Sequence, residues 1–140
     1  MHRDFQSKNI TIFKGEIYLL DFQDACLGPY TYDLVSLLED PYVMLYRDTV
    51  SQLKDYYLQR MNELMFIKIN PEDFEKDYNF SACSRLFQAI GAFSRLKENN
   101  KDEFEQYIEP AFSRLISLID SEKFPVISNF LNEIATIIWK

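Results

Sequence analysis

The feature that most constrains this 140-residue chain lies in its first 24 residues, where two short apolar runs are flanked on both sides by acidic and amide side chains. The runs lie at 10–13 and 16–20 and are joined by Lys14-Gly15. A two-residue connection containing glycine is typical of a tight β-hairpin turn. Because a hairpin reverses the chain, we expect Asp21 to return beside the polar residues that precede the first run.

Those preceding residues, His2 to Asn9, read H-R-D-x-x-x-x-N, a spacing typical of the catalytic loop of kinase-type phosphotransferases. Phosphoryl transfer needs the acceptor hydroxyl, the phosphate and Mg²⁺ held in line. The Asp4 carboxylate can accept or orient the acceptor's proton, while the oxygens of Asn9 and Asp21 suit a small hard cation such as Mg²⁺. We interpret His2 as a structural member of the loop, since Asp4 is better placed to act as the base.

The segment after the hairpin carries a more specific pattern. Residues 21–38 contain D-F-Q-D-A followed by G-P-x-x-Y-D-L-V-S-L-L, and residues 88–96 contain Q-x-x-G-x-F-x-R-L. With the H-R-D loop, these motifs resemble the aminoglycoside phosphotransferase and choline kinase superfamily, whose members share the protein-kinase fold. Within it, the chain is most similar to the bacterial N-acetylmuramate/N-acetylglucosamine anomeric kinases of cell-wall recycling. The resemblance covers residues 2–97, and the last third of the chain matches only in its helical character.

The resemblance implies a role for each motif residue, with ATP as phosphoryl donor. Asp4 is the expected catalytic base, and Asn9 and Asp21 are the expected Mg²⁺ ligands. Asp33 is expected to accept hydrogen bonds from backbone amides of the catalytic loop, although an aspartate at a helix start is also favoured by the helix dipole alone. Three further residues are candidates for contact with phosphate or sugar, as against simple surface placement: Arg3, Gln23 and Asp24.

Residues that normally precede such a loop are expected to be missing. No Gly-rich phosphate loop is found, because Gly15, Gly28 and Gly91 are the only glycines, and no strand lysine or partner glutamate helix precedes His2. We therefore expect this chain to lack the N-terminal nucleotide-binding lobe and to be inactive alone. It would be a truncated product, a fragment or half of a split enzyme, which a separate front lobe or self-association would complete.

Charge and cysteine content exclude several other classes of protein. The formal net charge is −7 and the pI is about 4.7, which argues against nucleic-acid or anionic-membrane binding. No signal peptide or membrane-spanning apolar run is recognisable. Cys26 and Cys83 have no metal-ligand spacing and are interpreted as free thiols in a reducing compartment, so a cytoplasmic location is expected.

After residue 30 the apolar residues recur at three- and four-residue spacing, which predicts helices and a packed core. Asn70-Pro71 is typical of a helix start. The expected helices lie at 31–39, 46–66, 70–99, 104–119 and 125–138. The predicted fold class is α+β and mainly α-helical, the C-terminal lobe of a protein-kinase-like fold. A single domain is expected over 1–140, with the catalytic loop, hairpin and metal-binding segment in 1–30 packed on a helical bundle in 31–140.

The sequence therefore predicts part of a Mg²⁺- and ATP-dependent kinase that phosphorylates a hydroxyl of a small molecule, with an amino sugar as the favoured acceptor. An aminoglycoside or a choline-like amino alcohol is the alternative acceptor, since fold-level analogy cannot separate them. A non-catalytic binding or scaffold fragment is the alternative from another class.

Overall fold

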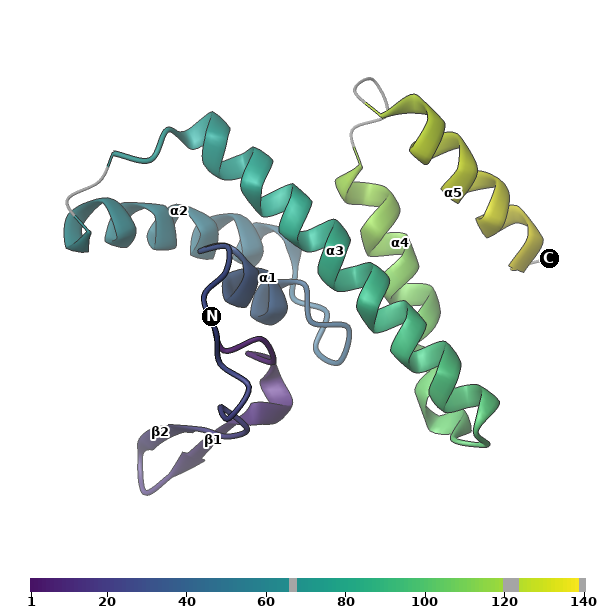
Figure 1. The fold of residues 1–140 in the computed structure, drawn as a ribbon, viewed down its shortest axis with the longest axis horizontal. Helices are drawn as coiled ribbons and strands as arrows, with labels where there is room; N and C mark the ends of the chain where they lie inside the picture. Colours follow the sequence, from purple (N-terminus) through teal and green to yellow (C-terminus); the bar gives the residue numbers. More distant parts are fainter. Residues whose placement is uncertain (66–67, 120–123, 139–140) are drawn as a thin grey trace. The chain divides into compact units, whose positions relative to one another are not determined.

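The computed structural model describes residues 1–65, 68–119 and 124–138, and within these ranges it contains one β-hairpin and five α-helices (Figure 1). The predicted α+β, mainly helical class is confirmed. The elements are β1 (Ile10–Phe13), β2 (Glu16–Leu19), α1 (Tyr32–Leu38), α2 (Arg47–Leu64), α3 (Pro71–Glu98), α4 (Ile108–Leu118) and α5 (Pro125–Ile138), with the short 3₁₀ helices η1 (Ser7–Asn9) and η2 (Asp102–Tyr107).

The chain divides into two compact units, Met1–Ala82 and Cys83–Lys140, and helix α3 contributes residues to both. The single domain expected over residues 1–140 stays a prediction. All the motif residues of the first 40 positions lie in the first unit, so the candidate site can be described within it.

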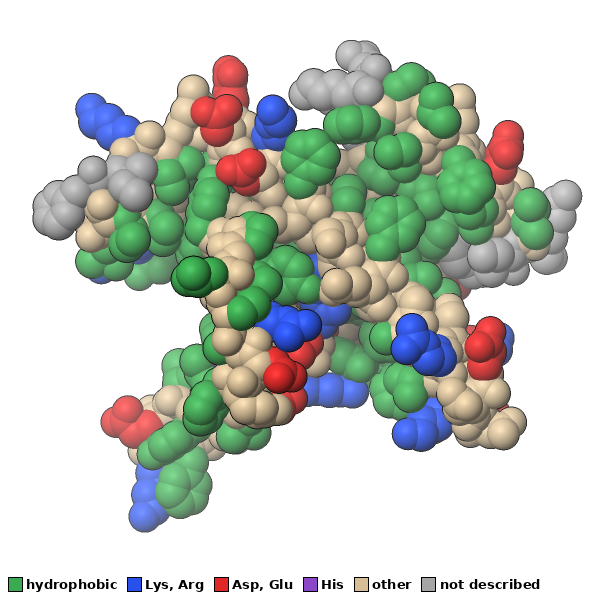
Figure 2. All heavy atoms as spheres, in the orientation of Figure 1, with side chains coloured by type: hydrophobic (Ala, Val, Ile, Leu, Met, Phe, Trp, Pro, Cys, Tyr) green, Lys and Arg blue, Asp and Glu red, His purple; other side chains and the backbone are tan. Residues whose placement is uncertain are grey.

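The predicted hairpin is formed by antiparallel β1 and β2, with Phe13 paired to Glu16 and Ile10 paired to Leu19. The two turn residues have positive φ angles, 53° at Lys14 and 83° at Gly15, as a two-residue type I′ turn requires. Apolar side chains on both strands remain exposed and form a hydrophobic surface over the hairpin (Figure 2). The hairpin is therefore held mainly by its own ladder and by the loops at its base.

The core of the first unit is built by α1, α2 and the first turns of α3. Its fully or almost fully buried side chains include Val35, Leu38, Val50, Phe74 and Tyr78. Because the apolar spacing of these helices is three to four residues, each helix presents one stripe to this core.

Within that core, the buried Glu39 carboxylate is neutralised locally. It accepts a hydrogen bond from the Tyr78 hydroxyl at 2.6 Å and forms an ion pair with Arg47 at 3.0 Å. A buried carboxylate is tolerated only with such partners.

Helix α3 begins as predicted. The Asn70 side chain caps it by accepting a hydrogen bond from the Glu72 amide at 2.9 Å, and Pro71 occupies the first turn, where no amide donor is needed.

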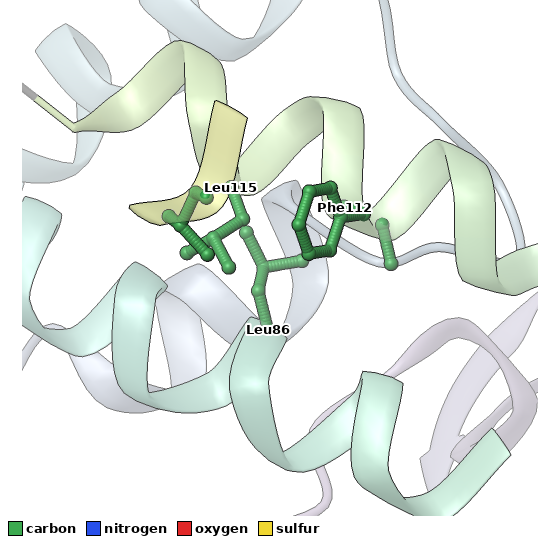
Figure 3. Close-up of a cluster of buried hydrophobic side chains, with 5 residues drawn as sticks. Leu86, Phe112 and Leu115 are labelled. Carbon is green, nitrogen blue, oxygen red and sulfur yellow. The ribbon is translucent and has the colours of Figure 1, made fainter. Parts of the chain in front are cut away.

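The second unit has its own core, in which Leu86 of α3 meets Phe112 and Leu115 of α4 (Figure 3). Ala111 and Leu131 complete the buried cluster. The continuous helix expected over 104–119 is wrong in its first part, where η2 runs to Tyr107 and α4 begins only at Ile108. Pro110 explains the difference, because its ring would clash with the carbonyl of Gln106 in a continuous α-helix, whereas a proline is tolerated in a first turn.

Not every apolar stripe is buried. In α5, Leu131 is 1% exposed but Val126 is 80% and Phe130 is 58% exposed, and in α2 Leu64 is 62% exposed. The expectation that these stripes form core is thus met only in part, because a helix buries only the stripe that faces a neighbour. Across the described ranges, no helix has an apolar stretch long enough to cross a bilayer.

Candidate active site

The beginning of the H-R-D loop is anchored to the first turn of α1. The Asp33 carboxylate accepts hydrogen bonds from two consecutive backbone amides, that of His2 at 2.5 Å and that of Arg3 at 3.0 Å. Arg3 has a φ of 79°, a backbone conformation that costs a non-glycine residue about 1–3 kcal/mol. Each hydrogen bond to a charged acceptor contributes about 1.5–3 kcal/mol, so this pair offsets the strain at Arg3. This is the geometry that the expected role of Asp33 requires.

Two hydrogen bonds within the loop are accepted by the same backbone carbonyl, that of Asp4. The Asp4 carbonyl oxygen accepts from the Gln6 amide and from the Asn9 side-chain amide nitrogen, both at 2.9 Å. Because the Asn9 nitrogen Nδ2 is the donor, its oxygen Oδ1 remains as the acceptor of that side chain. The loop therefore presents a carboxylate, at Asp4, and an amide oxygen, at Asn9, from the same short turn.

The hairpin returns the chain to the loop as predicted. The Leu20 amide donates to the Asn9 carbonyl oxygen at 2.9 Å, which continues the ladder beyond the Ile10–Leu19 pair. Asp21 follows immediately, exposed and with a φ of 63°. Its Oδ1 accepts a hydrogen bond from the Gln23 side chain at 2.5 Å, so the glutamine orients this carboxylate.

Other predicted site residues lie outside these pairs. Arg3 and Asp24 have exposed side chains, and in the part of the chain that the structure describes Asp24 makes no hydrogen bond or ion pair. The His2 ring packs edge-on against Phe5, with centroids 5.9 Å apart, and both its ring nitrogens are buried without a hydrogen-bond partner. The structural role expected for His2 stays a prediction.

The oxygen donors fit a small hard cation. Asn9 Oδ1 and the Asp21 carboxylate are the ligand types that Mg²⁺ takes, and this ion commonly uses only one or two protein carboxylates together with water and phosphate oxygens. Within the described ranges, no group of three or more His, Cys, Asp and Glu side chains is arranged to hold a metal.

A cavity of about 350 Å³ lies between the loop and α1. Its wall is mostly apolar and aromatic, with the Asp33 carboxylate among the lining groups and Phe5, Tyr30, Leu34 and Tyr57 around it. Burial, followed by the hydrogen bond to Asp77, raises the pKa of Tyr30 to about 12. Burial also raises the pKa of Tyr57, with the charge of Asp33 as a further cause. Both phenols therefore remain protonated donors at neutral pH.

Met1 closes one side of this cavity. Its backbone carbonyl accepts from the Cys26 amide at 3.0 Å, and its amine donates to the Cys26 carbonyl at 2.6 Å. A Cβ at Gly28 would lie 2.3 Å from the Met1 sulfur, so the absence of a side chain there allows the two segments to approach.

Sequence reasoning missed two residues of this site, Ser7 and Asp40. Asp40 is buried beyond the end of α1 and accepts hydrogen bonds from both the backbone amide and the hydroxyl of Ser7. In the sequence Asp40 stands out only as the residue before Pro41, which marks the end of a helix and gives no sign of a distant partner.

Comparison with known proteins gives a consistent set of relatives. Residues 1–64 match the phosphotransferase enzyme family. The chain is 33% identical over 112 residues to the N-acetylmuramate/N-acetylglucosamine kinase of Neisseria meningitidis, which covers 77% of this chain and 33% of that protein. The kinases of the same name from Pseudomonas putida and Pseudomonas aeruginosa are 31% identical over 97 residues and 28% identical over 124 residues. These matches cover 69% and 81% of this chain and 29% and 36% of the relatives. The chain thus spans about a third of the length of the curated relatives it matches.

Proposed function

Since the chain is similar to the phosphotransferase enzyme family and to curated amino-sugar kinases, we propose that it forms the catalytic-loop part of a kinase that transfers a phosphoryl group from ATP to a hydroxyl of an amino sugar. The observation that carries the proposal is the H-R-D-x-x-x-x-N loop, whose first amides bind Asp33 and whose Asn9 amide binds the carbonyl of Asp4. A loop held in this way can present its carboxylate and its amide oxygen to reactants at a fixed separation.

In this proposal Asp4 orients the acceptor hydroxyl and accepts its proton as the new bond to phosphorus forms. Asn9 Oδ1 and the Asp21 carboxylate would hold Mg²⁺, which when bound neutralises charge on the phosphates. Gln23 acts on Asp21, because its hydrogen bond fixes which carboxylate oxygen is available. Arg3 of the loop and Asp24, three residues after Asp21, are exposed and are proposed as contacts with phosphate or sugar.

The acceptor class is proposed from the names of the relatives. Three curated proteins are named N-acetylmuramate/N-acetylglucosamine kinase, so we propose an amino-sugar hydroxyl as the acceptor. A cytoplasmic role in peptidoglycan recycling is proposed from the motif resemblance alone. Because each relative is about three times as long as the matched segment, we also propose that nucleotide-binding elements come from further polypeptide.

An acceptor panel tests this function. The native protein purified from its source cells is supplied with labelled ATP or GTP, Mg²⁺ and one acceptor from a set that includes N-acetylmuramic acid, N-acetylglucosamine, an aminoglycoside and choline. We expect labelled product from ATP and an amino sugar, lost with EDTA and lost in Asp21→Ala. Asp55→Ala is the control, because Asp55 is an exposed aspartate of α2 and is not one of the motif residues.

Labelling of choline or the aminoglycoside alone would replace the acceptor class and keep the kinase. If none of the acceptors gives a labelled product, the proposal that the protein is a kinase fails, and a binding or scaffold role is left.

A further inference from the structure

Asp40 is buried, with 2% of its surface exposed, and lies just beyond the C-cap of α1. Aspartate is almost never buried to this extent without partners. Its Oδ2 accepts hydrogen bonds from the Ser7 amide at 2.8 Å and the Ser7 hydroxyl at 2.6 Å, and its Oδ1 accepts from the Tyr42 amide at 3.0 Å. One carboxylate therefore joins the far end of the H-R-D loop to the segment that follows α1.

A second contact ties the same two segments. The Lys8 ammonium lies 3.5 Å from the centroid of the Tyr42 ring, within the range of a cation–π interaction. Two consecutive loop residues, Ser7 and Lys8, are thus held by a stretch of three residues, 40–42. Because two independent contacts join the same two segments, the arrangement is more than a chance contact at the surface.

The two loop-binding aspartates are spaced to hold both ends of the loop. Asp33 lies in the first turn of α1, and Asp40 lies just beyond the C-cap of the same helix. Asp33 binds the amides at His2 and Arg3, and Asp40 binds Ser7. Two carboxylates at opposite ends of the α1 segment therefore bind the start of the loop and its last turn.

We propose that Asp40 is a positioning residue for the phosphotransfer reaction, which acts by fixing the orientation of Asn9. Ser7 and Asn9 are the two ends of the 3₁₀ turn η1, so a constraint on Ser7 is passed to Asn9 within one turn. Asn9 donates from its backbone to the Gln6 carbonyl and from its side chain to the Asp4 carbonyl, both at 2.9 Å. Release of Ser7 frees the turn and lets both bonds break. The inference rests on the proposed function for the role of Asn9 as a metal ligand.

The first test measures the position of Asn9 without any catalysis. Hydrogen exchange of the ¹⁵N-labelled full chain is compared by NMR for the wild type, Asp40→Asn, Ser7→Ala and the surface control Asp55→Asn. Asp40→Asn removes the charge and leaves one acceptor oxygen in place of two, so the bonds from the Ser7 and Tyr42 amides cannot both be kept at full strength. We expect the Ser7 backbone amide and the Asn9 side-chain amide to exchange about tenfold faster in this variant, which corresponds to the loss of about 1.4 kcal/mol. Ser7→Ala removes only the hydroxyl bond and keeps the amide bond, so we expect a smaller rise at the same two groups.

Unchanged exchange of the Asn9 side-chain amide in Asp40→Asn would overturn the proposal. If Asp40→Asn unfolds, Ser7→Ala decides: faster exchange confined to residues 4–9 supports positioning, and no change at Asn9 overturns it.

The second test uses the active enzyme and separates positioning from general support of the fold. We expect Asp40→Asn to raise the half-saturating Mg²⁺ concentration about tenfold, the usual order for losing a group that orients a metal ligand, with the KM for the sugar changed less than about twofold. A fall in kcat with an unchanged Mg²⁺ requirement would overturn the proposal. If the wild type phosphorylates no acceptor, the proposed function fails, and the exchange measurement still decides whether Asp40 positions Asn9.

Discussion

Replacing Asp33 with alanine is expected to release the start of the H-R-D loop from α1. The substitution removes both acceptors of the His2 and Arg3 amides and leaves the α1 backbone intact. Two interpretations of Asp33 were possible from sequence, an anchor of the loop and a helix-start charge. The two interpretations predict different losses of stabilising free energy in Asp33→Ala.

The expected magnitude comes from the two hydrogen bonds. Each bond to a carboxylate contributes about 1.5–3 kcal/mol, and the Arg3 bond is exposed, so we take the lower end and expect a total near 3 kcal/mol. This equals about a hundredfold change in the equilibrium for opening the loop. A charge that only interacts with the helix dipole contributes about 0.3–1 kcal/mol, less than about tenfold.

The assay is native-state hydrogen exchange of the Arg3 amide, with urea unfolding followed in parallel. Asp48→Ala is the matched control, because Asp48 lies in the first turn of α2 and is exposed. We expect the Arg3 amide to exchange about a hundredfold faster in Asp33→Ala and to be unchanged in the control. Asp33→Asn keeps one carbonyl oxygen and should fall between the two. An acceleration below about fivefold in Asp33→Ala would refute the anchor and support the dipole interpretation.

Three further predictions concern stability. Leu115→Ala leaves a cavity in the second unit's core and should lower the free energy of unfolding by about 2–5 kcal/mol in urea, whereas a loss below about 1 kcal/mol would mean that this cluster is not a packed core. The raised pKa of Tyr30 stabilises the fold fully below about pH 10, and this contribution is lost as the pH rises toward 12. In Tyr30→Phe, the free energy of unfolding should therefore fall less steeply between about pH 10 and 12. Identical alkaline unfolding curves for the two proteins would contradict the raised pKa. Gly15→Val forces a β-branched residue to a φ of 83° and should weaken the protection of the β1–β2 amides against hydrogen exchange. Lys14→Asn should leave that protection intact, because asparagine tolerates a positive φ. Equal protection in both variants would exclude the type I′ turn.

Local chemistry explains which parts of the fold could be predicted from the sequence. The hairpin follows from a glycine between two apolar runs, and the start of α3 follows from an asparagine cap and a proline in the first turn. Both signals act within a few residues and need no distant partner. The break between η2 and α4 also has a local signal, Pro110, because a proline disfavours a continuous helix through the preceding turn.

The features that could not be predicted depend on contacts between residues that are far apart in the sequence. Asp40 binds Ser7 across 33 residues of sequence, and nothing in the residues around Asp40 indicates that contact. The exposed stripes of α2 and α5 have the same cause, because periodicity predicts an amphipathic helix but not which part of the stripe has a neighbour. The contact of Asp33 with the loop was expected only through the family resemblance, since the aspartate alone fits a helix start equally well.

We propose that the H-R-D loop of this chain takes part in phosphate transfer to an amino sugar through Asp4. The most direct test follows the labelled γ-phosphate of ATP onto N-acetylmuramic acid or N-acetylglucosamine, using the native protein and its Asp4→Asn variant. This substitution preserves the size of the side chain and removes its basicity. We predict a phosphorylated sugar from the wild type and a rate at least about a hundredfold lower from the variant. Equal rates from the two proteins, or no phosphorylated sugar from the wild type, would contradict the account.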